Sequence, residues 1–368
     1  MKVAMVNLTH GGMSGGYHKY LRSLVPLLRD DVRITRLDVF LPSGLPAPDE
    51  GPVHRWDAGP GASAAGALSR RLRELRPDVL FFPTARSVRY DGPPAVIMVR
   101  NMEPLTRPFG GNTWHESLRN LARARAARAA CRRASRIIAV SHHVQQFVVN
   151  AWGIPAERVA LVYHGVEAPG ASLEKAPEAL AELKHFVFTA GSVRPARGLE
   201  DLIGAAPALL RSNPALKIVI AGRSDPSGTQ YERRMRQLAA RLGVAGAIVW
   251  VGHLEPMELS WAYQHCAAFV VTSRVEACPN VALEAMSHCG RIVSTSEDPL
   301  PEFFGEVATY YRAGDATALA TRLLAVLAAS TDAEGRARAA TERAGTFTWK
   351  RTANQTVDEL RRAAESAR

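Results

Sequence analysis

The sequence predicts an α/β protein built from two doubly wound parallel sheets. Three observations lead to this prediction. The chain has 368 residues, more than one typical domain holds. Short β-rich apolar runs alternate with helical stretches through both halves, which is typical of parallel sheets covered by helices. Residues 167–180 contain Pro169, Gly170 and Pro177 without a core pattern, so we expect domains at 1–168 and 169–346 joined by a linker.

In the first half, five apolar runs are predicted strands: residues 2–8, 32–39, 79–82, 95–99 and 136–140. Helices are predicted at residues 17–28, 69–75 and 117–136. The loop His10–Gly16 joins the first strand to the first helix and is rich in glycine. Its glycines, which include Gly15 and Gly16, permit a close approach of the backbone to a bound group. The loop lacks the spacing of a dinucleotide fingerprint, and a tight structural turn is the alternative interpretation.

In the second half, the predicted strands are residues 186–190, 217–221, 247–251, 268–272 and 291–294. Helices are predicted at residues 199–210, 231–242, 257–266 and 281–287, and a charged helix after residue 347. Ligands of such sheets bind outside the carboxyl ends of the strands. Two units of this kind therefore indicate a ligand cleft between two domains.

The composition is that of an ordinary globular protein, with 47% hydrophobic and 22% charged residues. No apolar run is long enough to cross a bilayer, and the apolar N-terminal stretch is too short for a signal peptide. The four cysteines, at 131, 266, 278 and 289, form no C-x-x-C pair. That spacing argues against a disulfide framework or a zinc site, so we expect a cytoplasmic protein.

The net charge of +11 is unevenly placed, because seven arginines and no acidic residue lie within residues 117–136. A basic helix of this kind can meet phosphate, anionic lipid or nucleic acid. No aromatic residue interrupts it, which disfavours base stacking, so we expect no nucleic-acid partner. The interpretations left open are docking on an anionic membrane surface at the periphery of the membrane and a merely solvated face. In both, Leu118, Leu121 and Ala122 would pack inward.

The most informative stretch holds two glutamates, Glu276 and Glu284, eight positions apart between a predicted strand and a predicted helix. Asn280, after Pro279, suits the N-cap of that helix. The backbone N–H groups of Asn280, Val281 and Ala282 would then be free, and such a helix N-terminus holds phosphate. Two carboxylates beside it suit the hydroxyls of a sugar and a ribose. The alternative is two surface charges on an ordinary βα unit.

This stretch resembles the E-x7-E signature of retaining glycosyltransferases with the GT-B fold, in particular glycosyltransferase family 4. The resemblance covers roughly residues 3–350, and the second half matches better than the first. It implies two Rossmann-like domains that face each other across a cleft, the first on the acceptor side and the second on the donor side. It also implies a C-terminal helix at 347–368 that crosses back to the first domain.

A second segment carries the resemblance at Gly191–Ile203, after the first strand of the second half. The family usually has Gly-Arg, a short spacer and Lys-Gly, and the two cations hold the diphosphate of the donor. Here Ser192 stands in place of the arginine and Arg197 in place of the lysine, and Arg194 would supply the missing charge. Arginine suits phosphate through paired donors. Two exposed loop arginines without a ligand are the alternative interpretation.

The resemblance implies further site residues. Gly15 and Gly16 would lie near the donor phosphate and acceptor, while Gly252 and His253 would lie near the base. Ser141 precedes a stretch that ends with His164 and Glu167, where the family has Asn and Asp. His142 and His143 diverge as neighbours and have no evident third ligand, so we expect no metal there. At Asn101 and Glu103 many relatives have a histidine, so these two residues are the candidates for the acceptor side.

Taken together, the resemblance implies transfer of a sugar from a nucleotide diphosphate sugar to a glycan, a lipid-linked glycan or a small-molecule glycoside, with retention, as in bacterial glycan biosynthesis. Arg197 and Arg194 would stabilise the charge on the departing diphosphate. Glu284 would bind the ribose, and Glu276 the donor sugar. No cofactor and no metal are expected. The alternatives are a nucleotide-sugar epimerase on the same fold and a non-catalytic module that binds sugars or polyanions.

Overall fold

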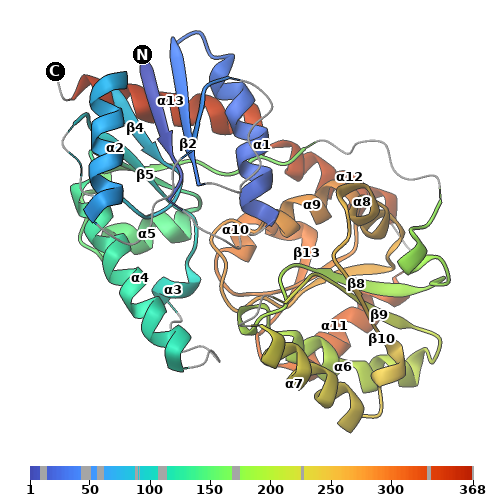
Figure 1. Ribbon diagram of the computed structural model, residues 1–368. Helices are drawn as coiled ribbons and strands as arrows, with labels where there is room; N and C mark the ends of the chain where they lie inside the picture. The colour runs from blue at the N-terminus through green and yellow to red at the C-terminus, as the bar shows by residue number, and fades with distance from the viewer. Residues whose placement is uncertain are drawn as a thin grey trace. The chain divides into compact units, whose positions relative to one another are not determined.

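The computed structural model describes residues 1–8, 15–42, 51–55, 62–87, 90, 92–106, 114–167, 175–224, 228–329 and 333–366. The chain divides into two compact units, which are described separately. Unit 1 comprises Met1–Pro108, Thr113–Gly165 and Thr348–Arg368, and unit 2 comprises Val166–Phe347. In Figure 1, unit 1 runs from blue to green and ends in the red helix α13, while unit 2 runs from green to orange-red.

Unit 1 is built on a seven-stranded sheet in the order β3-β2-β1-β4-β5-β6-β7, and every pairing is parallel. The strands are β1 Lys2–Val6, β2 Arg36–Leu41, β3 Val53–Arg55, β4 Val79–Phe82, β5 Ala95–Val99, β6 Arg136–Ala139 and β7 Val159–Leu161. The helices are α1 Gly15–Arg29, α2 Ala62–Leu75, α3 Glu103–Thr106, α4 Trp114–Arg133, α5 His142–Asn150 and α13 Trp349–Glu365. The strands β4 and β5 are buried along their whole length, as expected of parallel strands that are covered on both faces.

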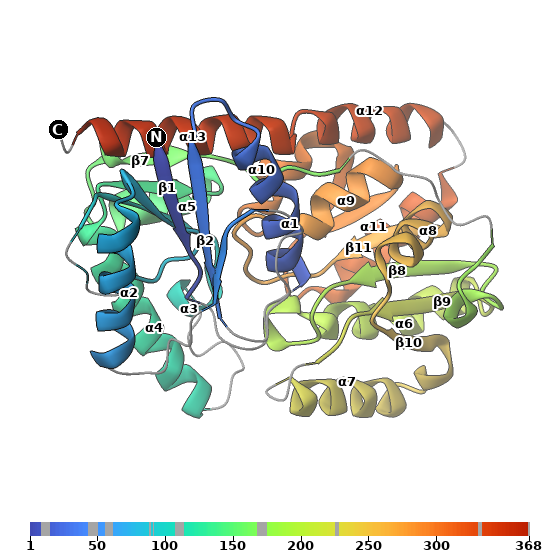
Figure 2. The ribbon, with the colours of Figure 1, turned by 45° about the horizontal axis from the view of Figure 1, so that its top comes forward.

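The helix α13 belongs to unit 1 although it follows unit 2 in the sequence. It packs against α1 and against β4, β5 and β6, and Figure 2 shows its length along this unit. Its buried apolar residues recur at helical spacing, at Trp349, Ala353, Val357 and Leu360. This stripe is the amphipathic pattern that covers a sheet.

Unit 2 is built on a six-stranded parallel sheet in the order β10-β9-β8-β11-β12-β13. The strands are β8 Phe186–Ala190, β9 Lys217–Ala221, β10 Ile248–Gly252, β11 Ala268–Val271, β12 Ile292–Thr295 and β13 Ala308–Tyr311. The helices are α6 Leu199–Ser212, α7 Thr229–Arg241, α8 Pro256–His265, α9 Asn280–His288, α10 Leu300–Phe304, α11 Ala316–Ala328 and α12 Ala333–Gly345.

The helices of unit 2 form two groups. The helix α6 contacts α7 and α11, whereas α9 contacts α8, α10 and α12. The two groups cover opposite faces of the sheet (Figures 1 and 2). The core on the first face joins α6, α7 and α11 to the strands through large apolar side chains, including Leu202, Leu209, Tyr231 and Leu323. The α/β class and the two parallel sheets predicted from the sequence are thus confirmed.

Three local predictions were wrong. The second strand begins at Arg36, not at residue 32, because Val32 is 94% exposed in the turn after α1. The basic helix spans Trp114–Arg133, not residues 117–136, whereas the strand predicted from residue 136 does begin there as β6. Leu118 is 53% exposed and Ala122 is also exposed, so neither packs inward, while Leu121 is half-buried. The buried positions of α4 are instead Ser117, Asn120, Ala127, Ala130 and Cys131.

Candidate functional site

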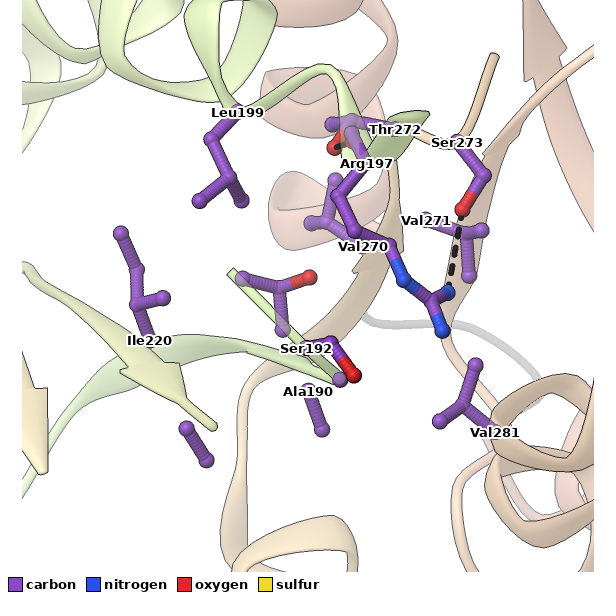
Figure 3. A pocket seen from close by; sticks show the side chains of 13 residues that line it. Ala190, Ser192, Arg197, Leu199, Ile220, Val270, Val271, Thr272, Ser273 and Val281 are labelled. Atoms are coloured by element: carbon purple, nitrogen blue, oxygen red, sulfur yellow. Dashed lines mark hydrogen bonds between the residues drawn. The ribbon is translucent and has the colours of Figure 1, made fainter. Parts of the chain in front are cut away.

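A small cavity lies at the carboxyl ends of the strands β8, β9 and β11 in unit 2 (Figure 3). Its volume is about 10 Å³, roughly the space of one water molecule. The lining residues come from the ends of these strands, the following loops and the start of α9: Thr189, Ala190, Gly191, Ser192, Arg197, Leu199, Ile220, Ala221, Val270, Val271, Thr272, Ser273 and Val281. This is the edge of a doubly wound sheet at which ligands bind.

Glycines end the three neighbouring strands β8, β9 and β10 at this edge. The N–H of Gly191 donates to the carbonyl of Ala221 at 3.0 Å, and the N–H of Gly222 donates to the carbonyl of Gly252 at 2.6 Å. A Cβ atom at Gly222, where φ is +138°, would lie 1.8 Å from the carbonyl oxygen of Gly191. Only glycine therefore allows the backbones to approach this closely.

The loop after β8 is tied to the loop after β11. The Thr272 hydroxyl donates to the Arg197 carbonyl at 2.5 Å, and the Arg274 N–H donates to the Ala196 carbonyl at 2.8 Å. A Cβ atom at Gly198 would lie 2.4 Å from the Thr272 carbonyl oxygen. The two loops thus form one continuous wall of the cavity, and this wall places the side chain of Arg197.

Arg197 and Glu276 form an ion pair at the cavity. Arg197 Nη1 donates to Glu276 Oε1 at 2.6 Å and to Ser273 Oγ at 3.2 Å, and the second of these bonds is the dashed line in Figure 3. Ser273 Oγ in turn donates to the same Oε1 atom at 2.8 Å. Within the described part of the chain, Arg197 Nε and Nη2 and Glu276 Oε2 make no hydrogen bond.

Gly191 lies against the face of the Arg197 guanidinium. A Cβ atom there, at φ +133°, would lie 2.9 to 3.0 Å from the Cζ, Nε and Nη2 atoms of Arg197. Because the three distances are nearly equal, the glycine meets the plane of the guanidinium and not its edge. The Nε–Nη2 edge, whose paired donors match phosphate oxygens, is left without a protein partner among the described residues.

Glu284 lies on α9 and is half-buried. It accepts a hydrogen bond of 3.2 Å from the hydroxyl of Tyr263 on α8. Burial, and then the nearby Glu284 carboxylate, raise the pKa of Tyr263 well above its usual value, so this hydroxyl remains a proton donor at physiological pH. The structure therefore fixes the carboxylate of Glu284 from the neighbouring helix.

The start of α9 differs from the prediction in two respects. Pro279, and not Asn280, occupies the N-cap position, and Asn280 is the first helical residue. The N–H of Ala282 is not free, since it donates to the carbonyl of Pro279 at 2.9 Å. This contact tightens the first turn and uses the N–H of Ala282 within the helix itself. Val281 lines the cavity.

Of the predicted donor-side residues of unit 2, Gly191, Arg197 and Val281 line this cavity, whereas Glu276, Glu284, Asn280, Ala282, Gly252, Arg194 and His253 do not. Arg194 precedes the short 3₁₀ turn Pro195–Arg197 and is half-buried. His253 follows Gly252 at the end of β10, and its side chain is half exposed, with Nε2 3.8 Å from Glu255 Oε1. Gly252 itself accepts the Gly222 hydrogen bond.

A buried ion pair lies behind the wall formed by the two loops. The Asp201 carboxylate on α6, 3% exposed, accepts two hydrogen bonds from Arg274, at 2.6 and 2.8 Å. It also accepts from the Tyr311 hydroxyl at 3.0 Å and from the Gly314 N–H at 2.9 Å. Burial and the Asp201 charge raise the pKa of Tyr311, so its hydroxyl stays protonated and donates.

The predicted acceptor-side residues all lie in unit 1. Asn101 is exposed, and its Oδ1 accepts from the N–H of Glu103, the first residue of α3. Ser141 is fully buried, and its hydroxyl oxygen accepts from the Val144 N–H as the N-cap of α5. The structure thus gives Asn101 and Ser141 local capping roles.

The glycine-rich loop lies mostly outside the described residues, but its last two glycines begin the helix α1. The carbonyl of Gly16 accepts a hydrogen bond of 3.3 Å from Arg100 Nη2. The guanidinium of Arg100 lies over the rings of Tyr17 and Tyr20, at 4.7 and 4.5 Å from their centroids. Gly15 is the first residue of the helix. These contacts fix the first turn of α1 above the end of β5.

Among the described residues, no group of three or more His, Cys, Asp or Glu side chains is arranged to hold a metal ion. None of the helices in the part of the chain described here has the length and apolar character needed to cross a membrane.

Ser273, Thr272 and Gly222 lie in the walls of the site although no role was predicted for them. The signal for Gly222 was its position directly after an apolar strand, as at Gly191. The two hydroxyl residues gave no comparable signal, because the partner that they share, Arg197, lies about 75 positions away in the sequence.

Two family models match the chain over adjoining stretches. The model described as Glycosyltransferase Family 4 matches residues 14–168, and the model described as Glycosyl transferases group 1 matches residues 172–343. The chain is also 27% identical over 250 residues to the D-inositol 3-phosphate glycosyltransferase of Geodermatophilus obscurus. That match covers 63% of this chain and 53% of the relative, so the chain matches about half the length of this relative.

Solved structures are similar over nearly the whole chain. The sucrose-phosphate synthase of Thermosynechococcus elongatus superimposes with a TM-score of 0.78 at 19% identity, covering 100% of both chains. Anabaena Alr3699/HepE in complex with UDP-glucose superimposes with a TM-score of 0.75 at 19% identity, covering 98% of this chain and 99% of the other. At these identities the similarity shows the fold.

Proposed function

The chain belongs to the group 1 glycosyltransferases and has their GT-B fold, and from this premise we propose that it transfers a sugar from a nucleotide diphosphate sugar to an acceptor. One observation carries the proposal. Arg197 is fixed through Nη1 and keeps its Nε–Nη2 edge without a protein partner among the described residues, in a cavity at the start of α9. An anionic group of the donor is the natural ligand of that edge.

We propose that the diphosphate of the donor lies between Arg197 and the N-terminus of α9. The helix terminus contributes partial positive charge, and the guanidinium contributes a full charge. Both would stabilise the charge that grows on the departing diphosphate. Arg194, which does not line the cavity, would approach only when the donor is bound. Gly191 is required because a side chain there would displace the guanidinium.

The two glutamates serve different parts of the donor in this proposal. Glu276 has one oxygen committed to Ser273 and Arg197, and its other oxygen is available for the hydroxyls of the donor sugar. Glu284, fixed by Tyr263, would accept hydrogen bonds from the ribose. Gly252 and His253 would lie near the base. In this proposal both carboxylates bind the donor, whereas the two carboxylates of a glycoside hydrolase act as acid and base.

We further propose that the anomeric configuration is retained and that no metal takes part. Positive charge at the diphosphate would come from Arg197 and the helix N-terminus, and these groups fulfil the role that a divalent ion has elsewhere. Retention is tested by NMR of the product anomer, since inversion would contradict it. Metal independence predicts unchanged turnover in EDTA, and loss of turnover restored by Mg²⁺ would contradict it.

The proposal is tested by a thermal-shift screen of the purified protein against UDP-, GDP-, ADP- and dTDP-sugars. A ligand that binds only the native state raises the melting temperature. UDP-sugars are the first candidates, since a structural neighbour was crystallised with UDP-glucose. We expect one nucleotide class to raise the melting temperature in the wild type and in the Glu306→Ala control, whose residue is exposed near the amino end of β13.

The Glu284→Ala variant is expected to lose that shift, because the ribose loses its acceptor. If no nucleotide sugar shifts the wild type, and the protein instead binds heparin with a steep dependence on salt, the protein is a polyanion-binding module and the proposal is wrong. Conversion of the donor into its epimer without transfer would favour the epimerase alternative.

On the acceptor side we propose a glycan, a lipid-linked glycan or a small-molecule glycoside, bound by unit 1 near Asn101, Glu103, Ser141 and the start of α1. The surface of α4 supports a lipid-linked acceptor. Trp114 and Leu118 are 66% and 53% exposed on this helix, beside exposed arginines at 119, 125, 128 and 132. Apolar side chains together with arginines suit an anionic bilayer surface.

The surface proposal predicts that vesicles containing phosphatidylglycerol bind the protein, whereas vesicles of phosphatidylcholine alone do not. Each basic residue near such a surface contributes about 1 kcal/mol. Replacing Arg125 and Arg128 with Glu should therefore weaken sedimentation with anionic vesicles by more than tenfold. Equal sedimentation of wild type and variant would contradict the proposal and leave α4 as a solvated face.

A further inference from the structure

The hydroxyl group of Ser273 forms hydrogen bonds with two side chains of the proposed donor site and, among the described residues, with no backbone atom. The residue follows β11 and is 1% exposed. Its Oγ donates to Glu276 Oε1 at 2.8 Å and accepts from Arg197 Nη1 at 3.2 Å. Both hydrogen-bonding functions of the hydroxyl are therefore used between an anion and a cation.

The backbone of Ser273 is itself fixed. Its carbonyl accepts a hydrogen bond of 2.8 Å from the hydroxyl of Thr295, which ends the neighbouring strand β12 and is fully buried. The next residue, Arg274, is bonded to Asp201 and to the carbonyl of Ala196. The Ser273 hydroxyl therefore sits at a defined point between the two loops.

Other buried serines of unit 2 use their hydroxyls differently. Ser287 on α9 donates to the Leu283 carbonyl at 3.1 Å, and Ser294 on β12 donates to the Thr295 carbonyl at 3.0 Å. Each of these hydroxyls donates to a carbonyl of the nearby backbone. The Ser273 hydroxyl instead bonds to two charged side chains, and this placement points to a role in arranging them.

We propose that Ser273 is a positioning residue for sugar transfer, and this rests on the proposed function. Its hydroxyl holds Glu276 Oε1 and Arg197 Nη1 together. Glu276 Oε2 is then turned to the hydroxyls of the donor sugar, and the Nε–Nη2 edge of Arg197 is turned to the diphosphate. Without the hydroxyl the ion pair can form in other rotamers, and the two groups lose their fixed relation to the donor.

The test is the Ser273→Ala variant, with Ser287→Ala as the matched buried serine and Ser273→Thr as the variant that keeps a hydroxyl. We expect kcat to fall about ten- to a hundredfold in Ser273→Ala, the size of a lost hydrogen bond to a charged group. Affinity for the nucleotide alone should change less than about threefold, because Arg197 keeps Glu276 as a partner. Ser287→Ala should match the wild type, and Ser273→Thr should recover much of the lost activity.

A second arm separates positioning from a general structural effect. Calorimetry gives the dissociation constants of the nucleotide and of the nucleotide sugar. The first divided by the second measures how much the contacts of the sugar add to the affinity. In Ser273→Ala this ratio should fall towards one, and the same substitution in a Glu276→Ala background should not change it further. An equal further decrease in that background would mean that Ser273 does not act through Glu276 and would overturn the proposal.

The outcomes also distinguish the two proposals. If the wild type binds and transfers a sugar while Ser273→Ala has wild-type kcat and sugar affinity, only the role of Ser273 is wrong. If the wild type binds no nucleotide sugar, the proposed function and the role of Ser273 are both wrong.

Discussion

Replacing Asp201 with alanine should strongly destabilise unit 2. The Asp201 carboxylate is 3% exposed and accepts four hydrogen bonds, two from Arg274, one from Tyr311 and one from Gly314. The variant leaves a guanidinium that is only 16% exposed without its anion, and the buried Tyr311 hydroxyl and the Gly314 N–H lose their acceptor. Breaking a buried ion pair from one side costs about 3–5 kcal/mol, so we expect a loss of that order in the free energy of unfolding.

The functional consequence follows from the position of Arg274. Its guanidinium lies beside Gly198, with Nε 2.8 Å from the position that a Cβ atom of residue 198 would take, and its backbone N–H donates to the Ala196 carbonyl. Once Arg274 is released, the loop that carries Arg197 loses its support. Asp201→Ala should therefore also weaken nucleotide-sugar binding, although Asp201 does not line the cavity.

The assay is unfolding in urea, and hydrogen exchange of peptides from unit 2 reports how much of this unit is unfolded at each urea concentration. The matched control is Glu74→Ala, which removes an ion pair with Arg71 whose side chains are 52% and 48% exposed. Pairs of that kind contribute about 1 kcal/mol or less. A cost for Asp201→Ala no larger than that of Glu74→Ala would refute the reasoning about the buried pair.

Three further predictions concern other parts of the chain. Gly222→Ala should destabilise unit 2 by about 1–3 kcal/mol and abolish the donor-induced thermal shift, because its Cβ would lie 1.8 Å from the Gly191 oxygen; an unchanged shift would contradict this. Burial raises the pKa of Cys131 to about 12, so mass spectrometry after alkylation at pH 8 should find it unmodified in the native protein, because the thiolate is the reactive form. The hydrogen bond from Arg33 lowers the pKa of Asp31, so Asp31→Asn should cost about 1 kcal/mol at pH 7. Thermal melts should show this difference shrinking as the pH falls below about 4, whereas a difference that persists at pH 2 would contradict it.

Much of the fold was readable from the sequence, because buried parallel strands are continuous apolar runs. The strands Val79–Phe82, Ala95–Val99, Phe186–Ala190 and Lys217–Ala221 were predicted with the bounds that they have. The short edge strands β3, β7 and β13 were missed, since three or four residues at the edge of a sheet leave almost no pattern.

The face of α4 could not be predicted, because alanine and arginine alternate along it without a clear apolar stripe. The residues that pack inward are small ones such as Ala127 and Ala130. Alanine is common on both faces of this helix, so the sequence does not mark the buried face. The consequence was the wrong assignment of Leu118 to the interior.

In the site, the positions of Glu276, Glu284 and Arg197 next to the carboxyl ends of strands followed from the strand–loop–helix pattern. Their partners did not, because each is supplied by a distant segment: Tyr263 for Glu284 and the loop of Arg197 for Glu276. The cap of α9 was wrong for a similar reason. Local preference favours asparagine at an N-cap, but here Pro279 takes that position and its carbonyl binds the Ala282 N–H.

The membership of α13 in unit 1 has a consequence for the order in which the protein is made. Unit 2 is an insertion between Gly165 and Thr348, the two points at which the chain leaves and re-enters unit 1. A ribosome completes unit 2 before it synthesises the helix that covers β4, β5 and β6. Unit 2 can fold as a contiguous segment during translation, while unit 1 keeps an uncovered apolar sheet face until the last helix emerges.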